Sequence, residues 1–206
     1  MGLAHMTDPQ RYSIILADPP WNYSDKANAG KRGAAHKYPC LSFEHLVHLK
    51  VEGRSVFELA APDCVLFMWS TGPQEPVAIR LLEAWGFKFK TSAGFVWIKR
   101  GLPKTMKKTG IVKPGKLKWG MGHMTRANPE NVIIGTRGKP KRISAGVHSV
   151  IEYPATQHSA KPPITRDRIV QLLGDVPRIE LFAREVVPGW QAWGLELNNG
   201  LRIARG

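Results

Sequence analysis

The order of short apolar segments and helix-like segments along the chain limits its fold more than any other feature. Residues 13–17 form an apolar run that ends just before Pro19 and Pro20. Such a run is typical of a buried strand, and the prolines mark its end. We therefore expect a strand that delivers Asp18 to a loop. Similar strand composition recurs in four later segments, 64–70, 89–99, 131–137 and 178–183.

Two segments have the spacing of amphipathic helices. In residues 78–85 apolar side chains recur at i, i+3, i+4 and i+7, with Pro76 in the first turn and Gly86 after the end. Residues 162–173 have the same pattern and stop at Gly174. Strands that alternate with helices predict an α/β fold with a largely parallel sheet, whose ligands bind at the carboxyl ends of the strands. Asp18 is expected at such an end.

Length and charge restrict the class of protein. A chain of 206 residues with 43% hydrophobic content can bury one good core, so we expect a single domain over residues 7–206. Residues 1–5 resemble a vector remnant ahead of a native start at Met6. A formal charge of +14 favours a polyanionic partner such as DNA or RNA. Without a spanning apolar run or a signal-peptide pattern, a cytoplasmic protein with no membrane partner is expected. Cys40 and Cys64 are isolated, so no disulfide framework or metal site is predicted.

The motif Asp18-Pro19-Pro20-Trp21 carries the predicted chemistry. The exocyclic nitrogen of adenine is a poor nucleophile because its lone pair is delocalised into the ring. If the carboxylate of Asp18 accepts one amino hydrogen and the carbonyl of Pro19 accepts the other, the lone pair can be directed at a methyl donor. Pro20 helps to keep that backbone rigid, and Trp21 offers a face for a base that has left its stack.

Two segments are predicted to be mobile loops. Residues 22–39 lack a periodic apolar face and are long enough to order over a substrate. Residues 101–122 are rich in glycine, proline and lysine, and no acidic residue occurs between Glu83 and Glu130. We expect this second loop to bind phosphates, although charge for solubility alone is the competing interpretation. The cations assigned to nucleic acid are Lys104, Lys107, Lys108, Lys113, Lys116, Lys118 and Arg126.

The chain resembles the MT-A70-like family of adenine-N6 methyltransferases, typified by the catalytic subunit of the eukaryotic messenger-RNA writer and including bacterial and phage members. The resemblance extends from about Ile14 to Glu196. It is carried, in order, by 17–21, 67–72, 96–99, 122–123, Glu130, 159–162, 180–184 and 189–194. The order is that of a permuted enzyme, with the amino-methylating motif ahead of the cofactor segment.

The resemblance implies a Rossmann-like fold, S-adenosylmethionine as donor, direct methyl transfer and no metal. It implies that Lys161 and Arg184 reach the carboxylate or ribose of the cofactor, that Glu196 binds a ribose hydroxyl, and that Asp18 borders the cofactor. On the substrate side it implies that Tyr38 closes the 22–39 loop over the site and that Glu130 lies near the target base. His123 is expected to orient a loop or to contact the nucleic acid. The sequence departs from the family at Leu195, where many members have an asparagine.

These observations predict an enzyme that flips an adenine out of DNA and methylates its N6 amine. DNA is preferred over RNA because the chain is small, lacks added RNA-binding modules and resembles prokaryotic or phage members. Three alternatives stay open: an RNA adenine-N6 methyltransferase, a catalytically silent nucleic-acid-binding partner subunit, and a methyltransferase for the N4 amine of cytosine. Because the family includes paired subunits, a homodimer or a partner subunit is also left open.

Overall fold

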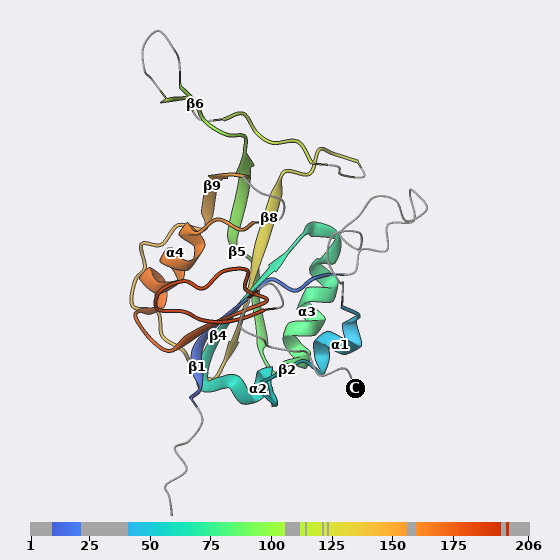
Figure 1. Cartoon of the computed structure of the whole chain (residues 1–206), viewed down its shortest axis with the longest axis vertical. Helices are drawn as coiled ribbons and strands as arrows, with labels where there is room; N and C mark the ends of the chain where they lie inside the picture. Colours follow the sequence, from blue (N-terminus) through green and yellow to red (C-terminus); the bar gives the residue numbers. More distant parts are fainter. Residues whose placement is uncertain are drawn as a thin grey trace, which may run out of the picture.

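The structure is a computed structural model of the chain, and it describes residues 10–21, 41–105, 112–113, 115–120, 122, 124–155, 160–194 and 197. A central sheet has helices on both faces (Figure 1). The elements are β1 Tyr12–Ala17, α1 Phe43–Val47, β2 Lys50–Val51, β3 Arg54–Ser55, α2 Val56–Leu59, β4 Ala60–Ser70, a 3-10 turn Gly72–Gln74, α3 Glu75–Ala84, β5 Lys88–Arg100, β6 Lys104–Thr105, β7 Val112–Lys113, β8 Pro129–Arg137, β9 Val150–Pro154, α4 Ile164–Leu173, β10 Arg178–Leu181 and β11 Gln191–Trp193.

The main sheet has seven strands in the order β11-β10-β1-β4-β8-β5-β9. β1 runs parallel to both β10 and β4, and the outer pairs β10–β11 and β5–β9 are also parallel. β8 is antiparallel to β4 and to β5. The predicted α/β fold with a largely parallel sheet is therefore confirmed, with β8 as the exception. No helix occurs in the described residues between β5 and β8, so these two strands pair antiparallel without a crossover helix.

The apolar run of β1 is explained by burial on both of its faces. Ile15 and Ala17 belong to the cluster that α3 covers, whereas Ile14 and Leu16 belong to the cluster that α4 covers. Because successive side chains of a strand point to opposite faces, a central strand between two helical layers is apolar at every position. This burial holds the end of β1, and with it Asp18, in a fixed place.

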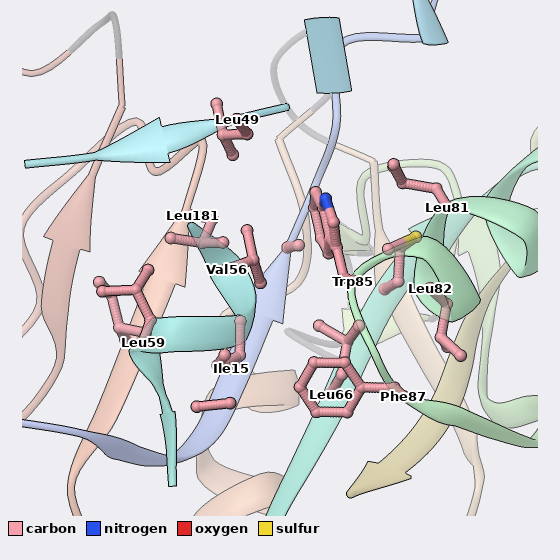
Figure 2. Packing of buried hydrophobic residues seen from close by; sticks show 14 of the residues in the cluster. Ile15, Leu49, Val56, Leu59, Leu66, Leu81, Leu82, Trp85, Phe87 and Leu181 are labelled. Carbon is pink, nitrogen blue, oxygen red and sulfur yellow. The ribbon is translucent and has the colours of Figure 1, made fainter. Parts of the chain in front are cut away.

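The helical layer on the α3 side packs closely onto the sheet. Leu81, Leu82 and Trp85 face Ile15 and other buried residues in Figure 2. The indole N–H of Trp85 donates to the carbonyl of Leu46 at 2.8 Å and so ties α1 to the end of α3. A Cβ on Gly135 of β8 would lie 2.6 Å from a methyl carbon of Leu82, so only glycine allows this approach of helix and sheet.

The sequence predicted the long elements well and the short ones poorly. α3 and α4 lie within a few residues of the predicted ranges, and α4 ends at Gly174, whose φ is +92°. The strand expected over 178–183 ends at Leu181 because the chain turns at Phe182, with φ of +62°. α1, α2, β9 and β11 were not predicted, since segments of three to five residues show little periodicity.

Several predicted features concern residues that the structure does not describe. The proposed vector remnant at 1–5 and the loop over 22–39 lie outside the described residues. No helix within the described ranges is long and apolar enough to cross a membrane.

Candidate active site

Asp18 lies where an α/β sheet places its ligands. It directly follows β1, which has β4 on one side and β10 on the other, and its backbone N–H donates to the carbonyl of Leu181 at 3.4 Å. The chain continues from β1 towards β4 and reaches β10 only near its end, so the tip of β1 is a switch point of the topology. Such points form crevices at the carboxyl ends of parallel strands.

The turn after Asp18 leaves one acceptor position on Pro19. The carbonyl of Pro19 accepts the backbone N–H of Trp21 at 2.8 Å, and the carbonyl of Pro20 accepts that of Leu41 at 3.2 Å. A carbonyl oxygen has two lone pairs, so the bond from Trp21 occupies only one acceptor position of Pro19. The turn is thus fixed by its own hydrogen bonds, and Pro19 itself is buried.

Trp21 is part of the core in this structure. Its side chain is 6% exposed, and its indole N–H donates to the backbone carbonyl of Trp69 at 3.2 Å. These contacts hold the turn against β4. The predicted role of Trp21 as a stacking face for the base stays a prediction, which this burial does not support.

Asp18 belongs to a row of four side chains whose charges alternate in sign. The Nζ atom of Lys161 lies 3.0 Å from Oδ2 of Asp18 and 3.4 Å from Oε2 of Glu130, and Lys99 forms a second, short ion pair with Oε1 of Glu130. The four side chains come from the loop after β1, from the segment ahead of α4, from β8 and from β5. They meet at one edge because β8 begins where its neighbours β4 and β5 end. We call these four residues the ionic cluster.

Aromatic rings support both lysines of the ionic cluster. The Nζ atom of Lys161 lies 5.5 Å from the ring centre of Trp69, and that of Lys99 lies 5.1 Å from the ring centre of Trp97. The two rings are perpendicular, with centres 6.2 Å apart. Trp69 and Trp97 are buried, as are Trp190 and Trp193. Cation–π attraction at such distances helps to fix each ammonium group in position.

Burial and pairing shift the pKa values within the ionic cluster. Burial raises the pKa of Asp18 above its ordinary value, against the attraction of Lys161. Burial would lower the pKa of Lys161, but Asp18 and Glu130 outweigh it and raise this pKa. Burial would likewise raise the pKa of Glu130, yet Lys161 and Lys99 together lower it. Lys161 is therefore a fixed cation and Glu130 a fixed anion, while Asp18 is the carboxylate that accepts a proton more easily than usual.

A second ionic group joins α4 to β10 beside the ionic cluster. The guanidinium of Arg166 binds both carboxylate oxygens of Glu180, at 2.7 and 3.1 Å, and donates to Glu185 at 2.9 Å. Burial raises the pKa of Glu180, which its bonds to Arg166 oppose. Sequence reasoning did not select Arg166 or Glu180, because nothing in their spacing indicates that they meet.

The segment that contains Arg184 follows a strained turn. Phe182 has a left-handed backbone, which is rare for a residue with a side chain, and its ring packs edge-on against Trp193 with centres 5.6 Å apart. A Cβ on Gly194 would lie 2.1 Å from the carbonyl oxygen of Ala183, so glycine is needed where the ends of β10 and β11 meet. The positive charge of Arg184 acts on Asp18 and lowers its pKa, though less than Lys161 does.

Not every predicted site residue can be placed. Tyr38, His123, Glu196, Lys107 and Lys108 lie outside the described residues, and of Lys113 only the backbone in β7 is described. Lys104, Lys116, Lys118 and Arg126 are exposed beyond the ends of β5 and β8. Among the described residues, no group of three or more histidine, cysteine, aspartate or glutamate side chains could hold a metal ion.

The structure adds Lys99 to the candidate site. No role was predicted for Lys99, although it belongs to segment 96–99, one of those that carry the resemblance. Its pairing with Glu130 follows from the register of β5 and β8, in which Trp97 and Glu130 are direct partners and Lys99 lies two residues further along β5. Periodicity in the sequence does not contain this register.

Comparison with known proteins gives relatives over most of the chain. The type II methyltransferase M.MunI of Mycoplasma sp is 34% identical over an alignment of 206 positions, which covers 91% of this chain and 78% of the relative. The human N(6)-adenine-specific methyltransferase METTL4 is 24% identical over 90% of this chain and 37% of its own length. An N(6)-adenosine-methyltransferase MT-A70-like protein of Arabidopsis thaliana is 24% identical over 93% of this chain and 24% of its own length.

A protein-family comparison covers the same region. The model described as MT-A70 matches residues 12–196, from the first residue of β1 to beyond the end of β11. The match includes Asp18, Glu130, Lys161 and every strand of the main sheet. The chain therefore belongs to the MT-A70 family of methyltransferases.

Proposed function

We propose that the chain transfers a methyl group from S-adenosylmethionine to the N6 amine of an adenine in DNA. The observation that carries the proposal is the position of Asp18, at the tip of β1 and held by Lys161 through Oδ2. Beside it, the carbonyl of Pro19 has an acceptor position left after its bond to Trp21. Two rigid hydrogen-bond acceptors next to each other can bind both hydrogens of an amine that is a poor nucleophile.

The role of the two acceptors follows from the chemistry of the amine. Each accepts one of the two N6 hydrogens, which makes the nitrogen more tetrahedral and directs its lone pair away from the ring. Because the ionic cluster and the turn hold both acceptors before the base arrives, little reorganisation remains for the reaction itself. No covalent intermediate with the protein is required. Asp18 and Pro19 position the amine, and the proton that N6 loses after transfer passes to the carboxylate of Asp18 and from there to water.

The residues at this edge fit S-adenosylmethionine, which supplies an electrophilic methyl group on a sulfonium. An ammonium group has three N–H donors, and Lys161 directs two towards Asp18 and Glu130, so a third can bind a carboxylate or hydroxyl of the cofactor. Arg184 adds positive charge at the end of β10, close enough to lower the pKa of Asp18. The close approach of Gly194 to Ala183 brings the β11 end towards this cation. Glu196 is proposed to bind a ribose hydroxyl of the cofactor.

The substrate side of the proposal rests on charge and on the relatives. Lys104, Lys116, Lys118 and Arg126 are exposed in the part of the chain between β5 and β8 and suit a phosphate backbone. M.MunI is named as a type II methyltransferase, and the names of the other two relatives specify adenine or adenosine. These names favour adenine N6 over cytosine N4. In the proposal Glu130 lies near the flipped base and Tyr38 closes over it.

The test is methyl transfer from labelled S-adenosylmethionine to duplex DNA, single-stranded DNA and RNA, each containing adenine. After digestion, mass analysis of the nucleosides must show N6-methyladenine in the DNA products. Label in RNA alone would identify an RNA enzyme, and label in cytosine would identify N4 chemistry. Cofactor binding without any transfer, under conditions in which DNA binds, would point to a silent subunit and contradict the proposal.

A further inference from the structure

A basic arm projects from the sheet between β5 and β8, and we define it as the described residues among 101–128. In Figure 1 it leads away from both helical layers at the β6 end of the molecule. The arm carries lysines and an arginine but no acidic residue. It also exposes four large apolar side chains, which are Leu102, Leu117, Trp119 and Met124.

The exposure of Trp119 is unusual for its residue type. Its side chain is 77% exposed, although tryptophan is highly buried on average and Trp21, Trp69, Trp85 and Trp97 of this chain are all buried. An exposed indole gains little from folding. A large flat apolar surface left in water, within a segment of one charge sign, suggests a ligand that is both flat and anionic.

The arm near Trp119 is tied to the sheet. The backbone N–H of Lys118 donates to the carbonyl of Lys99 at 2.9 Å, and that of Gly101 donates to the carbonyl of Lys116 at 2.8 Å. The side-chain amide of Asn128 donates to the carbonyls of both Lys99 and Lys118, at 2.9 and 2.7 Å. The residue before Trp119 is thus fixed beside Lys99, which belongs to the ionic cluster.

A tight turn after Trp119 and a cation over one face of the indole hold its place. A Cβ on Gly120 would lie 1.9 Å from the carbonyl oxygen of Ala127, so the chain turns tightly here and brings Arg126 back towards the ring. The guanidinium carbon of Arg126 lies 5.4 Å from the ring centre of Trp119. A cation over one face of an indole leaves the opposite face for another planar group, and its charge favours a phosphate nearby.

We propose that Trp119, supported by Arg126, is a stacking platform for an unpaired base of the nucleic acid next to the adenine in the active site. The inference rests on the proposed function for the identity of the ligand. A strand with one base turned out towards Asp18 exposes the faces of the neighbouring bases. The indole follows Lys118, which is hydrogen-bonded to Lys99 of the ionic cluster, and can cover one of these faces. The flanking Lys116 and Lys118 then meet the phosphates of the same strand. A protein partner would instead require apolar contacts without this density of positive charge.

The experiment compares two single-stranded ligands that differ only in their bases. One is a thymidine oligomer and the other an abasic oligomer of equal length, so the phosphate charge is the same. Wild type is expected to bind the thymidine oligomer more tightly. Trp119→Ala should weaken binding of the thymidine oligomer by about 5-fold to 100-fold, the range for loss of one base–aromatic stack, and should leave binding of the abasic oligomer unchanged. Trp119→Phe, which keeps an aromatic face, should retain part of the preference.

Two variants serve as matched controls. Met124→Ala removes another exposed apolar side chain of the arm and should leave both affinities unchanged. Lys118→Ala removes a charge and should weaken the binding of both oligomers by the same factor. The platform is overturned if Trp119→Ala loses affinity for both oligomers equally, or loses none. It is also overturned if Trp119→Ala changes the oligomeric state in light scattering while DNA binding stays intact. Methyl transfer by wild type is measured in parallel, so a failure of the proposed function is seen separately from a failure of the platform.

Discussion

The Nζ atom of Lys161 lies 3.0 Å from Oδ2 of Asp18 and shares its charge with Glu130 on the other side. The lysine thus occupies one oxygen of the carboxylate, and in the proposed reaction Oδ1 accepts the hydrogen of the amine. The contact also opposes the effect of burial on the pKa of Asp18. One cation therefore orients the proposed acceptor and favours its ionised form against the effect of burial.

Replacement of Lys161 by methionine is expected to reduce methyl transfer strongly and to change its pH dependence. Without the ammonium group, Asp18 loses its nearest cation while Glu130 keeps its ion pair with Lys99, and the pKa of Asp18 rises further. We expect kcat/KM at neutral pH to fall by about 100-fold or more, and its decline on the acid side to move to higher pH. Lys161→Arg should recover part of the rate with the original acid limb. An unshifted pH profile in the methionine variant would mean that Lys161 does not act through Asp18.

Asp18 itself should set the acid limb of the wild-type reaction. Burial raises its pKa above the ordinary 3.8, so the acceptor is protonated, and activity is lost, at a higher pH than for an exposed aspartate. Asp18→Asn replaces one acceptor position with a donor and should lower kcat by about 100-fold to 1000-fold. Its residual rate should show no acid limb from this group. DNA affinity should stay within a few-fold of wild type, since no positive charge near the phosphates is removed.

Glu130 is expected to stabilise the fold at neutral pH. Its folded-state pKa lies below the ordinary 4.5, because Lys161 and Lys99 outweigh the effect of burial. A carboxyl group with a lowered pKa contributes stability that is full above 4.5 and is lost as the pH falls through the folded value. Glu130→Gln should therefore lower the free energy of unfolding by about 1–2 kcal/mol at neutral pH. In urea titrations the difference should shrink below pH 4.5; an equal difference at all pH values would exclude this ionic origin.

The fold was predictable for the elements whose buried faces leave a clear apolar pattern in the sequence. β1 and β4 are apolar at successive positions because both of their faces are covered, and Ala78 to Trp85 show the period of a helix with one buried face. Short elements such as α1 and β11 depend on contacts with distant parts of the chain, which periodicity does not contain. The reversed direction of β8 was missed for the same reason.

The site was predictable only in part. Asp18 was found from its own motif, but Lys161 and Glu130 were selected through the family resemblance. Their direct contact depends on the strand order, which places β8 next to β4 and brings its first residues to the edge where β1 ends. Trp119 was missed because an aromatic residue within a lysine-rich segment has no periodic partner that would mark it as exposed or buried.

The two acidic partners of Arg166 offer a matched test of burial. Glu180 is 13% exposed and Glu185 is 62% exposed, and each accepts a hydrogen bond from the same guanidinium. Glu180→Ala leaves a largely buried Arg166 with only an exposed partner and should lower the free energy of unfolding by about 3 kcal/mol. Glu185→Ala should cost less than about 0.5 kcal/mol. Chemical denaturation of both variants decides; equal costs would show that α4 is not held to β10 through Glu180.

The basic arm should control the salt dependence of DNA binding. Exposed cations that contact phosphates release counterions from the duplex, so each contact adds about 0.9 to the slope of log affinity against log salt. Lys116→Ala combined with Lys118→Ala should lower that slope by up to about 1.8 and weaken binding equally across sequences. Lys139 and Lys141 are exposed just after the end of β8, at the opposite ends of the strands from Asp18. Their double alanine variant removes the same charge and should leave the slope unchanged; equal effects of the two pairs would mean that net charge, and not the arm, attracts the DNA.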